Sequence, residues 1–531
     1  MHTLRIAELR MMSWRSIFAV GGVALLVIGA TLVRRAGLPH RNMLLIADGC
    51  HTPATVLEPP AGASSVGTAI LLHGLGANRR TMNYLGADLA GHGLRTYLLD
   101  LRGHGDNVDP FSFARAEACA NATVDFLIRQ RAIDPATTIL VGHSLGGAIA
   151  IRMADREPVA ATIAISPAPM VLPRRMPANL LVFSGGFDLW PMKRQANDLV
   201  AAAGGQRSSP SDFSERRAVE LRVVPHATHT SLITDRRVAH DSGLWAAETL
   251  LSRIEHKTLG LSPDLSTHDS YGQGQQNLVG SLLGLVGLIL LFPAAVTFVG
   301  TMPIPSRDES IATKTPPAHP KHLLLIVEQA VCALVAVLIL AVFVPLRFLH
   351  LYDGDYLASL LLISGTLLLV LNWKHVRANF CVNVKALLIA AALAFAAFLA
   401  TSAWLDWQLA DLWMNAPRWQ RFAALLPVSF VFCFAEEIAL GPVGSGKHRT
   451  ARFSVFLAMR LELWLACIMA YYELDSGRAL LGVLVTGLAI FSILQRLASD
   501  SLRTRAGSAL AAAIFGAILA SWFIAAVFPL T

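Results

Sequence analysis

Short apolar runs alternate with amphipathic segments between residues 42 and 255. A short run of β-branched and other apolar residues predicts a buried strand, and apolar residues at every third or fourth position predict a helix. Helices are expected over 81–90, 112–131 and after residue 144, and strands over 69–72, 96–100, 138–142, 161–165, 180–183 and 221–224. This alternation predicts an α/β fold, with a mostly parallel sheet and helices on both faces.

Long apolar runs replace this alternation in the second half of the chain. About eight of them approach the length that crosses a bilayer, and they predict an all-α transmembrane domain. They cover residues 278–299, 323–346, 357–372, 386–404, 422–440, 453–472, 479–494 and 508–529.

One further apolar run covers residues 16–33 and is closed by Arg34 and Arg35. A cleaved signal peptide is one interpretation of such a run. An uncleaved membrane anchor is favoured, because the run is long for a signal peptide and no suitable small-residue cleavage site precedes Arg34.

These patterns divide the chain into four parts. They are an N-terminal segment with the anchor (1–41), an α/β domain (42–255), a polar linker rich in Gly, Ser, Gln and Asp (256–277), and a transmembrane domain of about eight helices (278–531).

The composition supports a membrane protein, since 54% of the residues are hydrophobic and only 15% are charged. A net charge of +8 is compatible with nucleic-acid binding. The basic residues form no patch with interleaved aromatic residues, however, and several of them flank the apolar runs. The lipid bilayer is therefore the expected partner, and nucleic acid is not.

The charges of the loops predict an orientation. Most Lys and Arg residues of the second half lie in alternate loops, namely 301–322, 373–385, 441–452 and 495–507. If these loops face the cytoplasm, the α/β domain lies outside a cell membrane of the bacterial inner-membrane type. Arg34, Arg35 and Arg41 argue against this orientation, because they would then flank the outer end of the anchor.

The segment Gly142-His143-Ser144-Leu145-Gly146 lies between an expected strand and an expected helix. Gly-x-Ser-x-Gly in this position is typical of a nucleophile elbow, in which the strained turn exposes the serine hydroxyl. Ser144 is the candidate nucleophile, and the Leu145 N–H at the helix N-terminus is a candidate oxyanion donor. A plain structural turn is the alternative.

A serine nucleophile needs a base, and an acid that orients the base. Asp188 follows the expected strand 180–183 through a glycine turn, and His229 follows the expected strand 221–224. This gives the chain order Ser, Asp, His of elbow enzymes. His226 is the alternative base, and a helix-capping role is the alternative for Asp188.

The strand 69–72 runs directly into His73-Gly74-Leu75-Gly76. In elbow enzymes this loop provides the second oxyanion donor, which here would be the Leu75 N–H. A simple turn is the alternative. We expect His73, Gly74 and His143 to contribute to substrate binding, and the Gly-rich turn 100–105 to be structural.

In this order, the motifs resemble those of α/β-hydrolases. The resemblance is greatest to the branch of lysophospholipases, monoacylglycerol lipases and serine aminopeptidase-like enzymes. It covers roughly residues 65–252 and rests on His73-Gly74, Asp100 with Arg102-Gly-His-Gly105, Gly142 to Gly146, Asp188 and His229. The resemblance implies an eight-stranded, mostly parallel sheet and acyl transfer without metal or cofactor. The cap of the family is not expected here, because only 44 residues separate Ser144 from Asp188 and 41 separate Asp188 from His229.

The sequence therefore predicts a membrane-anchored serine hydrolase that cleaves an ester, thioester or amide, most plausibly as an esterase or lipase on a hydrophobic or membrane-derived substrate. A catalytically silent sensor is one alternative. A serine aminopeptidase-like enzyme is another, although no lid segment supplies an acidic pocket for the substrate amine.

Three other features have weaker interpretations. Glu436 and Glu437 lie at the end of an apolar run, where helix packing is favoured over catalysis. The segment 441–448 only partly matches a phosphate-binding loop. The six cysteines show no paired spacing, so no disulfide framework and no metal site are expected; Cys332, Cys381, Cys433 and Cys467 are expected to pack among apolar residues.

Overall fold

The computed structural model describes residues 2–36, 40–60, 65–255, 271–299, 322–343, 347–380, 382–443, 447–473 and 479–531. The chain packs as two compact units. The α/β unit contains residues 27–284, with residues 404–411 and 529–531. The helical unit contains residues 1–26, 285–403 and 412–528.

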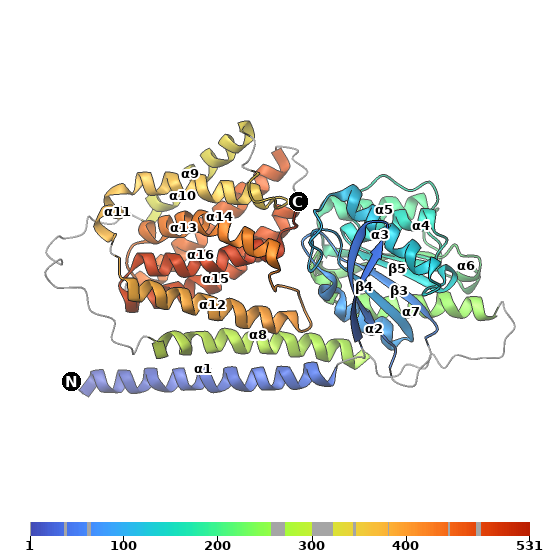
Figure 1. Cartoon of the computed structure of the whole chain (residues 1–531), viewed down its shortest axis with the longest axis horizontal. Coiled ribbons are helices and arrows are strands. Elements are labelled where there is room, and N and C mark those ends of the chain that lie inside the picture. The colour runs from blue at the N-terminus through green and yellow to red at the C-terminus, as the bar shows by residue number, and fades with distance from the viewer. Residues whose placement is uncertain are drawn as a thin grey trace. The chain divides into compact units, whose positions relative to one another are not determined.

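The α/β unit is built on one eight-stranded sheet (Figure 1). Its order is β1-β2-β4-β3-β5-β6-β7-β8. The pairs β1–β2 and β2–β4 are antiparallel, and all the other neighbouring pairs are parallel. The strands are β1 (His40–Ala47), β2 (Cys50–Leu57), β3 (Gly67–Leu72), β4 (Leu94–Leu99), β5 (Thr138–His143), β6 (Ala161–Ile165), β7 (Leu180–Phe187) and β8 (Val219–Thr228). The predicted α/β class and mostly parallel sheet are confirmed.

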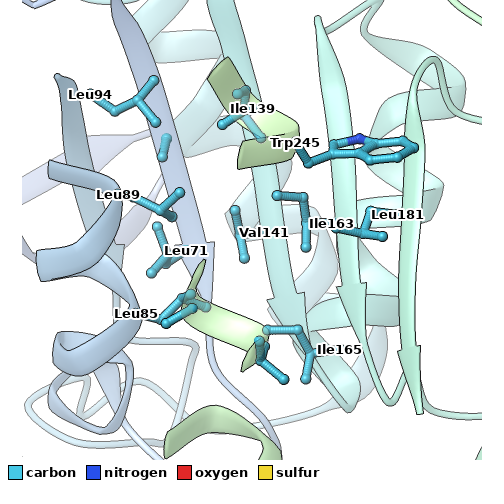
Figure 2. Packing of buried hydrophobic residues seen from close by; sticks show 14 of the residues in the cluster. Leu71, Leu85, Leu89, Leu94, Ile139, Val141, Ile163, Ile165, Leu181 and Trp245 are labelled. Atoms are coloured by element: carbon cyan, nitrogen blue, oxygen red, sulfur yellow. The ribbon is translucent and has the colours of Figure 1, made fainter. Parts of the chain in front are cut away.

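Alternate residues of a strand point to opposite faces of the sheet, and residues on both faces are buried. Leu181 of β7 joins the large core on one face, with Trp245 and Leu85 from the helices (Figure 2). Its neighbours Leu180 and Val182 pack against the helix α5 on the other face. The helices are α2 (Asn83–Gly91), α3 (Phe113–Arg129), α4 (Leu145–Arg156), α5 (Trp190–Ala202), α6 (Pro210–Ser214) and α7 (Arg236–Glu255).

The sequence pattern did not predict β1 and β2. Strand β1 carries exposed polar side chains, and only two of its eight residues are buried. It is an edge strand that contains the apolar run 43–47, a run that the sequence analysis did not recognise as a strand.

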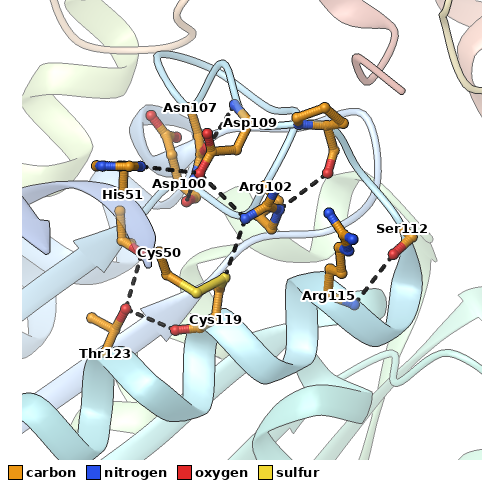
Figure 3. Close-up of a disulfide and its surroundings, with 12 residues drawn as sticks. Cys50, His51, Asp100, Arg102, Asn107, Asp109, Ser112, Arg115, Cys119 and Thr123 are labelled. Carbon is orange, nitrogen blue, oxygen red and sulfur yellow. Dashed lines mark hydrogen bonds and ion pairs between the residues drawn. A yellow bond between two sulfur atoms is a disulfide. The ribbon is translucent and has the colours of Figure 1, made fainter. Parts of the chain in front are cut away.

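A disulfide joins Cys50 of β2 to Cys119 of α3, which corrects the expectation from the cysteine spacing (Figure 3). The two residues are 69 positions apart, and the packing of α3 on the sheet brings their Cα atoms to 5.5 Å. Tertiary packing of this kind leaves no signal in cysteine spacing. Cys332, Cys433 and Cys467 are buried free thiols, as expected, and Cys381 lies outside the described residues.

Two segments distant in sequence complete the α/β unit. In residues 404–411, the Asp411 N–H donates to Asn78 Oδ1 over 3.1 Å, and Asn78 Nδ2 donates to the Asp411 carbonyl over 3.2 Å. In residues 529–531, Leu530 exchanges backbone hydrogen bonds with Gly103 and Phe111. Both segments therefore fix loops at the carboxyl ends of β3 and β4.

The helical unit contains long helices of high apolar content (Figure 1). Over the whole described chain, seven helices are long and apolar enough to cross a membrane: Ser16–Arg35, Gly274–Phe292, His322–Val342, Gly354–Leu371, Val384–Asp406, Ala416–Leu440 and Ala509–Val527. They lie in α1 (His2–Arg35), α8 (Tyr271–Val299), α9 (His322–Val342), α10 (Gly354–Leu371), α12 (Val384–Asp406), α13 (Ala416–Leu440) and α16 (Ala509–Val527).

Two predicted spans have no counterpart among these seven. The runs 453–472 and 479–494 lie in α14 (Lys447–Glu473) and α15 (Ala479–Ala506), and α14 carries Arg460 and Glu462 near its middle. The short helix α11 (Trp373–Asn379) follows α10. Helix α8 begins at Tyr271, so residues 271–277 are helical and not part of a linker.

Candidate active site

Ser144 occupies a strained turn between β5 and α4. Its φ of +53° is unusual for a residue with a side chain. The turn requires glycine on both sides, since a Cβ on Gly142 would lie 2.2 Å from the Gly146 carbonyl oxygen, and one on Gly146 would lie 2.1 Å from the Leu72 carbonyl oxygen. These contacts explain the Gly-x-Ser-x-Gly pattern as a consequence of close strand–helix packing.

A chain of hydrogen bonds links the three residues that the sequence singled out. Ser144 Oγ lies 3.0 Å from His229 Nε2, and His229 Nδ1 lies 3.0 Å from Asp188 Oδ1. With the proton on Nδ1, the ring donates to Asp188 and accepts from the serine hydroxyl. All three residues are buried, and they follow β5, β7 and β8 at the carboxyl edge of the sheet.

The alternative base, His226, does not reach this chain of hydrogen bonds. It is exposed, and its ring lies tilted against the ring of Phe187, with the ring centroids 5.6 Å apart. The geometry therefore favours His229, which directly follows β8, over His226, which lies within that strand.

Ser166 is a site residue that the sequence analysis missed. It follows β6, which lies between the strands of Ser144 and Asp188, and its Oγ is 2.7 Å from His229 Nδ1. Burial raises the pKa of Asp188, but hydrogen bonds from His229 and Ser166 outweigh burial and hold this pKa below its ordinary value. In the sequence, the signal for Ser166 was its position directly after a central strand, and no motif marks that position.

The loop after β3 lies against the nucleophile. A Cβ on Gly74 would lie 3.1 Å from the Ser144 Cβ and 2.8 Å from His143 Nδ1, so only glycine permits this approach. Leu75 follows in a half-buried turn, and Leu145 is the first residue of α4. The two backbone N–H groups predicted as oxyanion donors thus belong to segments that adjoin Ser144.

His73 and His143 are buried supports of these segments. His73 Nε2 accepts a hydrogen bond from the Leu101 N–H, and its Nδ1 contacts the Gly74 carbonyl at 2.8 Å. Both ring nitrogens are engaged and the ring is fully buried, so His73 holds the loop, and its role in substrate binding stays a prediction.

His143 Nε2 donates to the His229 carbonyl over 3.0 Å. Burial and the adjacent His229 lower the pKa of His143 to about 3, so this ring is neutral at ordinary pH. It therefore supports the backbone of His229 without competing with it for protons.

Three carboxylates lie close together beside the loop after β3. Oxygens of Asp100, Asp106 and Asp411 lie within 4.8 Å of one another, a spacing that could hold a cation. The Arg79 guanidinium already pairs with Asp100 and Asp106, and the Arg79 N–H donates to Asp100 over 2.7 Å. The arrangement is therefore explained by an ion pair that holds the turn 100–105, as predicted for a structural turn.

The described chain forms no cap helix between β6 and β7. Residues 166–179, between β6 and β7, contain no helix or strand. Phe187, Leu189 and Trp190 flank Asp188 and are exposed, with 66% of Phe187 and 68% of Trp190 accessible. The edge of the site thus presents apolar side chains to its surroundings.

In the helical unit, Glu436 and Glu437 belong to a buried ion cluster. Arg452 and Arg503 lie 3.2 Å and 2.5 Å from Glu437, and Arg460 lies 2.9 Å from Glu436. The cluster is completed by Arg496 and Asp500. It joins α13, α14 and α15, which agrees with the favoured role in helix packing. Part of the segment 441–448 lies outside the described residues.

Known proteins resemble part of the chain. Residues 69–265 match the model of the Alpha/beta hydrolase family. The uncharacterized proteins Rv2307c and MT2364 of Mycobacterium tuberculosis are 36% identical over 109 residues, which are 20% of this chain. The chain spans about 39% of the length of these curated relatives.

Several solved structures are similar to part of the chain. An alpha-beta serine hydrolase homologue from Coxiella burnetii is 19% identical, with 39% of this chain and 95% of that chain covered and a TM-score of 0.32. A serine hydrolase without lid from Xanthomonas campestris is 17% identical, with coverage of 43% and 98% and a TM-score of 0.34. A Pyrobaculum calidifontis esterase is 14% identical, with coverage of 46% and 93% and a TM-score of 0.33.

The sheet order and the family match agree. The α/β unit has the α/β-hydrolase fold, and the chain joins it to a large helical region with several apolar helices.

Proposed function

We propose that this chain is a membrane-anchored serine hydrolase that cleaves a carboxylic ester. The observation that carries the proposal is the hydrogen-bond chain from Ser144 through His229 to Asp188, with the serine on a strained elbow. A nucleophile, a base and an orienting acid are the groups that acyl transfer requires.

The proposed reaction has two halves. Ser144 Oγ attacks the ester carbonyl while His229 Nε2 takes the hydroxyl proton, and the Leu75 and Leu145 N–H groups stabilise the oxyanion. The tetrahedral intermediate collapses to an acyl-serine, and His229 gives its proton to the leaving alcohol. Water then attacks the acyl group by the same route, which releases the acid and restores Ser144. Asp188 stays ionised and holds the imidazole tautomer.

The substrate class follows from the surroundings of the site. Phe187, Leu189 and Trp190 adjoin Asp188 in the chain and are exposed, and such apolar side chains favour an apolar acyl or alcohol group. An enzyme held at a bilayer meets hydrophobic esters at high local concentration. A hydrophobic or membrane-derived ester is therefore the proposed substrate.

Close packing of α1 on α8 supports a retained anchor. A Cβ on Gly22 would lie 2.8 Å from the Gly287 carbonyl oxygen, and one on Gly29 would lie 2.5 Å from the Gly280 carbonyl oxygen. Small residues at such contacts are typical of paired membrane helices. Removal of α1 as a signal peptide would expose this surface of α8.

The disulfide supports an extracytoplasmic α/β domain. Cys50 and Cys119 are joined, and disulfides persist mainly in oxidising compartments. The positive-inside rule favours the same side. To test this, the protein is denatured and alkylated with a maleimide polymer before and after reduction. Two additional modified thiols after reduction are expected, and equal modification in both samples would contradict this location.

The function is tested by labelling membranes that carry the protein with a fluorophosphonate probe. We expect labelling of the wild type and of Ser208→Ala, an exposed control, and no labelling of Ser144→Ala. An ester panel of rising acyl length then tests the substrate class, with turnover expected to increase toward apolar esters. Equal labelling of wild type and Ser144→Ala, or none in folded protein, would exclude the serine hydrolase and favour a silent sensor.

A further inference from the structure

The residue after β6 is fixed between the nucleophile and the acid. β6 lies between β5 and β7 in the sheet. The Ser144 N–H donates to the Ile165 carbonyl over 2.9 Å, and the Ser166 N–H donates to the Phe183 carbonyl over 2.8 Å. Ser166 is therefore held by the backbones that carry the other site residues, and its side chain is fully buried.

The Ser166 hydroxyl faces both partners of the proposed acid–base pair. Its Oγ lies 2.7 Å from His229 Nδ1, and the hydroxyl helps to hold the pKa of Asp188 below its ordinary value. The residue holds a φ of +46°, a left-handed conformation that is rare for serine and favours glycine. A serine in this conformation, where glycine would be less strained, suggests that the hydroxyl is used.

The available protons define one consistent arrangement. An ionised Asp188 only accepts, so the hydroxyl proton of Ser166 goes to this carboxylate. The Oγ lone pairs then face the Nδ1–H of His229, which is shared between Ser166 and Asp188. This arrangement fits both the neutral ring with its proton on Nδ1 and the imidazolium that forms during acyl transfer.

We propose that Ser166 is a positioning residue that acts through His229 and Asp188, and that it holds the His229 ring with its proton on Nδ1. The proposal rests on the proposed hydrolase function. Because Ser166 is buried behind the imidazole, its loss should reduce the chemical step and leave substrate binding unchanged.

The first test compares Ser166→Ala and Ser166→Gly with the wild type. Both lose the hydroxyl, but glycine relieves the left-handed backbone, so Ser166→Gly keeps the test valid if the alanine variant folds poorly. We expect kcat on a short ester and the fluorophosphonate labelling rate to fall about 10- to 100-fold in both, as for loss of a hydrogen bond to a charged group, with KM within about twofold. Thr162→Val, which removes a buried hydroxyl elsewhere on β6, should retain wild-type rates.

The second test separates positioning from folding by a double-mutant cycle with Asp188→Asn. If Ser166 acts through the carboxylate, Ser166→Ala should change the remaining rate less than about threefold in the Asp188→Asn background. Independent, multiplying effects would overturn the proposal, and so would Ser166 variants within about twofold of the wild type. A wild type that does not label at Ser144 would instead refute the proposed function itself.

Discussion

Two groups of buried polar side chains differ in kind between the units. In the α/β unit, Ser144, His229 and Asp188 follow neighbouring parallel strands and contain one carboxylate. In the helical unit, the ion cluster joins three helices through four arginines and three carboxylates (Arg452, Arg460, Arg496, Arg503, Glu436, Glu437 and Asp500).

The difference lies in which groups can exchange a proton. An imidazole gains and loses a proton near neutral pH, whereas arginine stays protonated in proteins. In the ion cluster, every carboxylate pairs with at least one arginine, and no described base faces a nucleophile. Burial and charge alone therefore do not indicate catalysis, and the type and order of the groups do.

The largest effect is expected at the proposed base. His229→Gln removes the group that accepts the Ser144 proton, so kcat/KM on a soluble ester should fall about 10⁴-fold or more. The matched control is His226→Gln on the same strand end, which should stay within a few-fold of the wild type because its exposed ring does not reach Ser144. Comparable losses in the two variants would contradict the assignment of His229.

A substitution in the ion cluster should have the opposite effect: it should lower the stability of the fold and leave the reaction at Ser144 unchanged. Glu437→Gln removes a carboxylate that pairs with Arg452 and Arg503 and leaves Arg503 without its buried counter-charge, which typically costs about 3–5 kcal/mol of unfolding free energy. Thermal unfolding in detergent should show the loss, and labelling of Ser144 per folded molecule should be unchanged.

A control for this variant lies in the same unit. Glu462→Gln on α14 removes a carboxylate that makes no ion pair among the described residues, and it should be neutral or stabilising. If Glu437→Gln abolished labelling in protein that remained folded, the ion cluster would have a role in the reaction, and the contrast between the two groups would fail.

Local signals in the sequence were sufficient for the fold class and for the residues brought together at Ser144. The elbow glycines, Asp188 and His229 each follow a strand that its apolar run identifies. Ser166 could not be found in this way, because its role depends on β6 lying between β5 and β7, and strand order is a tertiary property.

The same reason explains the other omissions. Cys50 and Cys119 meet only after α3 packs on the sheet, and Glu437 meets its arginines only after three helices pack together. The sequence singled out Glu436 and Glu437 without naming their partners, and it did not single out Cys50 or Cys119. Contacts between elements far apart in the chain were therefore the part that local pattern could not supply.

A pH-dependent effect is expected at Asp411, a buried carboxylate of the α/β unit that faces other acids. Burial, the nearby Asp106 and a hydrogen bond with Asp406 raise its pKa to about 8, well above the value of about 4 in an unfolded chain. The folded state therefore binds a proton that the unfolded state has lost between these values. Stability should fall as pH rises through this window, by at most about 1.4 kcal/mol per pH unit, and level off above pH 8.

Asp411→Asn should remove this pH dependence, since the amide does not ionise. The exposed Asp198→Asn on α5 should retain it. We expect the midpoint of thermal unfolding of the wild type to fall relative to Asp411→Asn between about pH 5 and pH 8. Parallel curves for the two proteins would show that Asp411 is ionised in the folded state. If Asp411 is ionised, the three buried carboxylates differ only in their partners: imidazole for Asp188, arginine for Glu437 and neighbouring acids for Asp411.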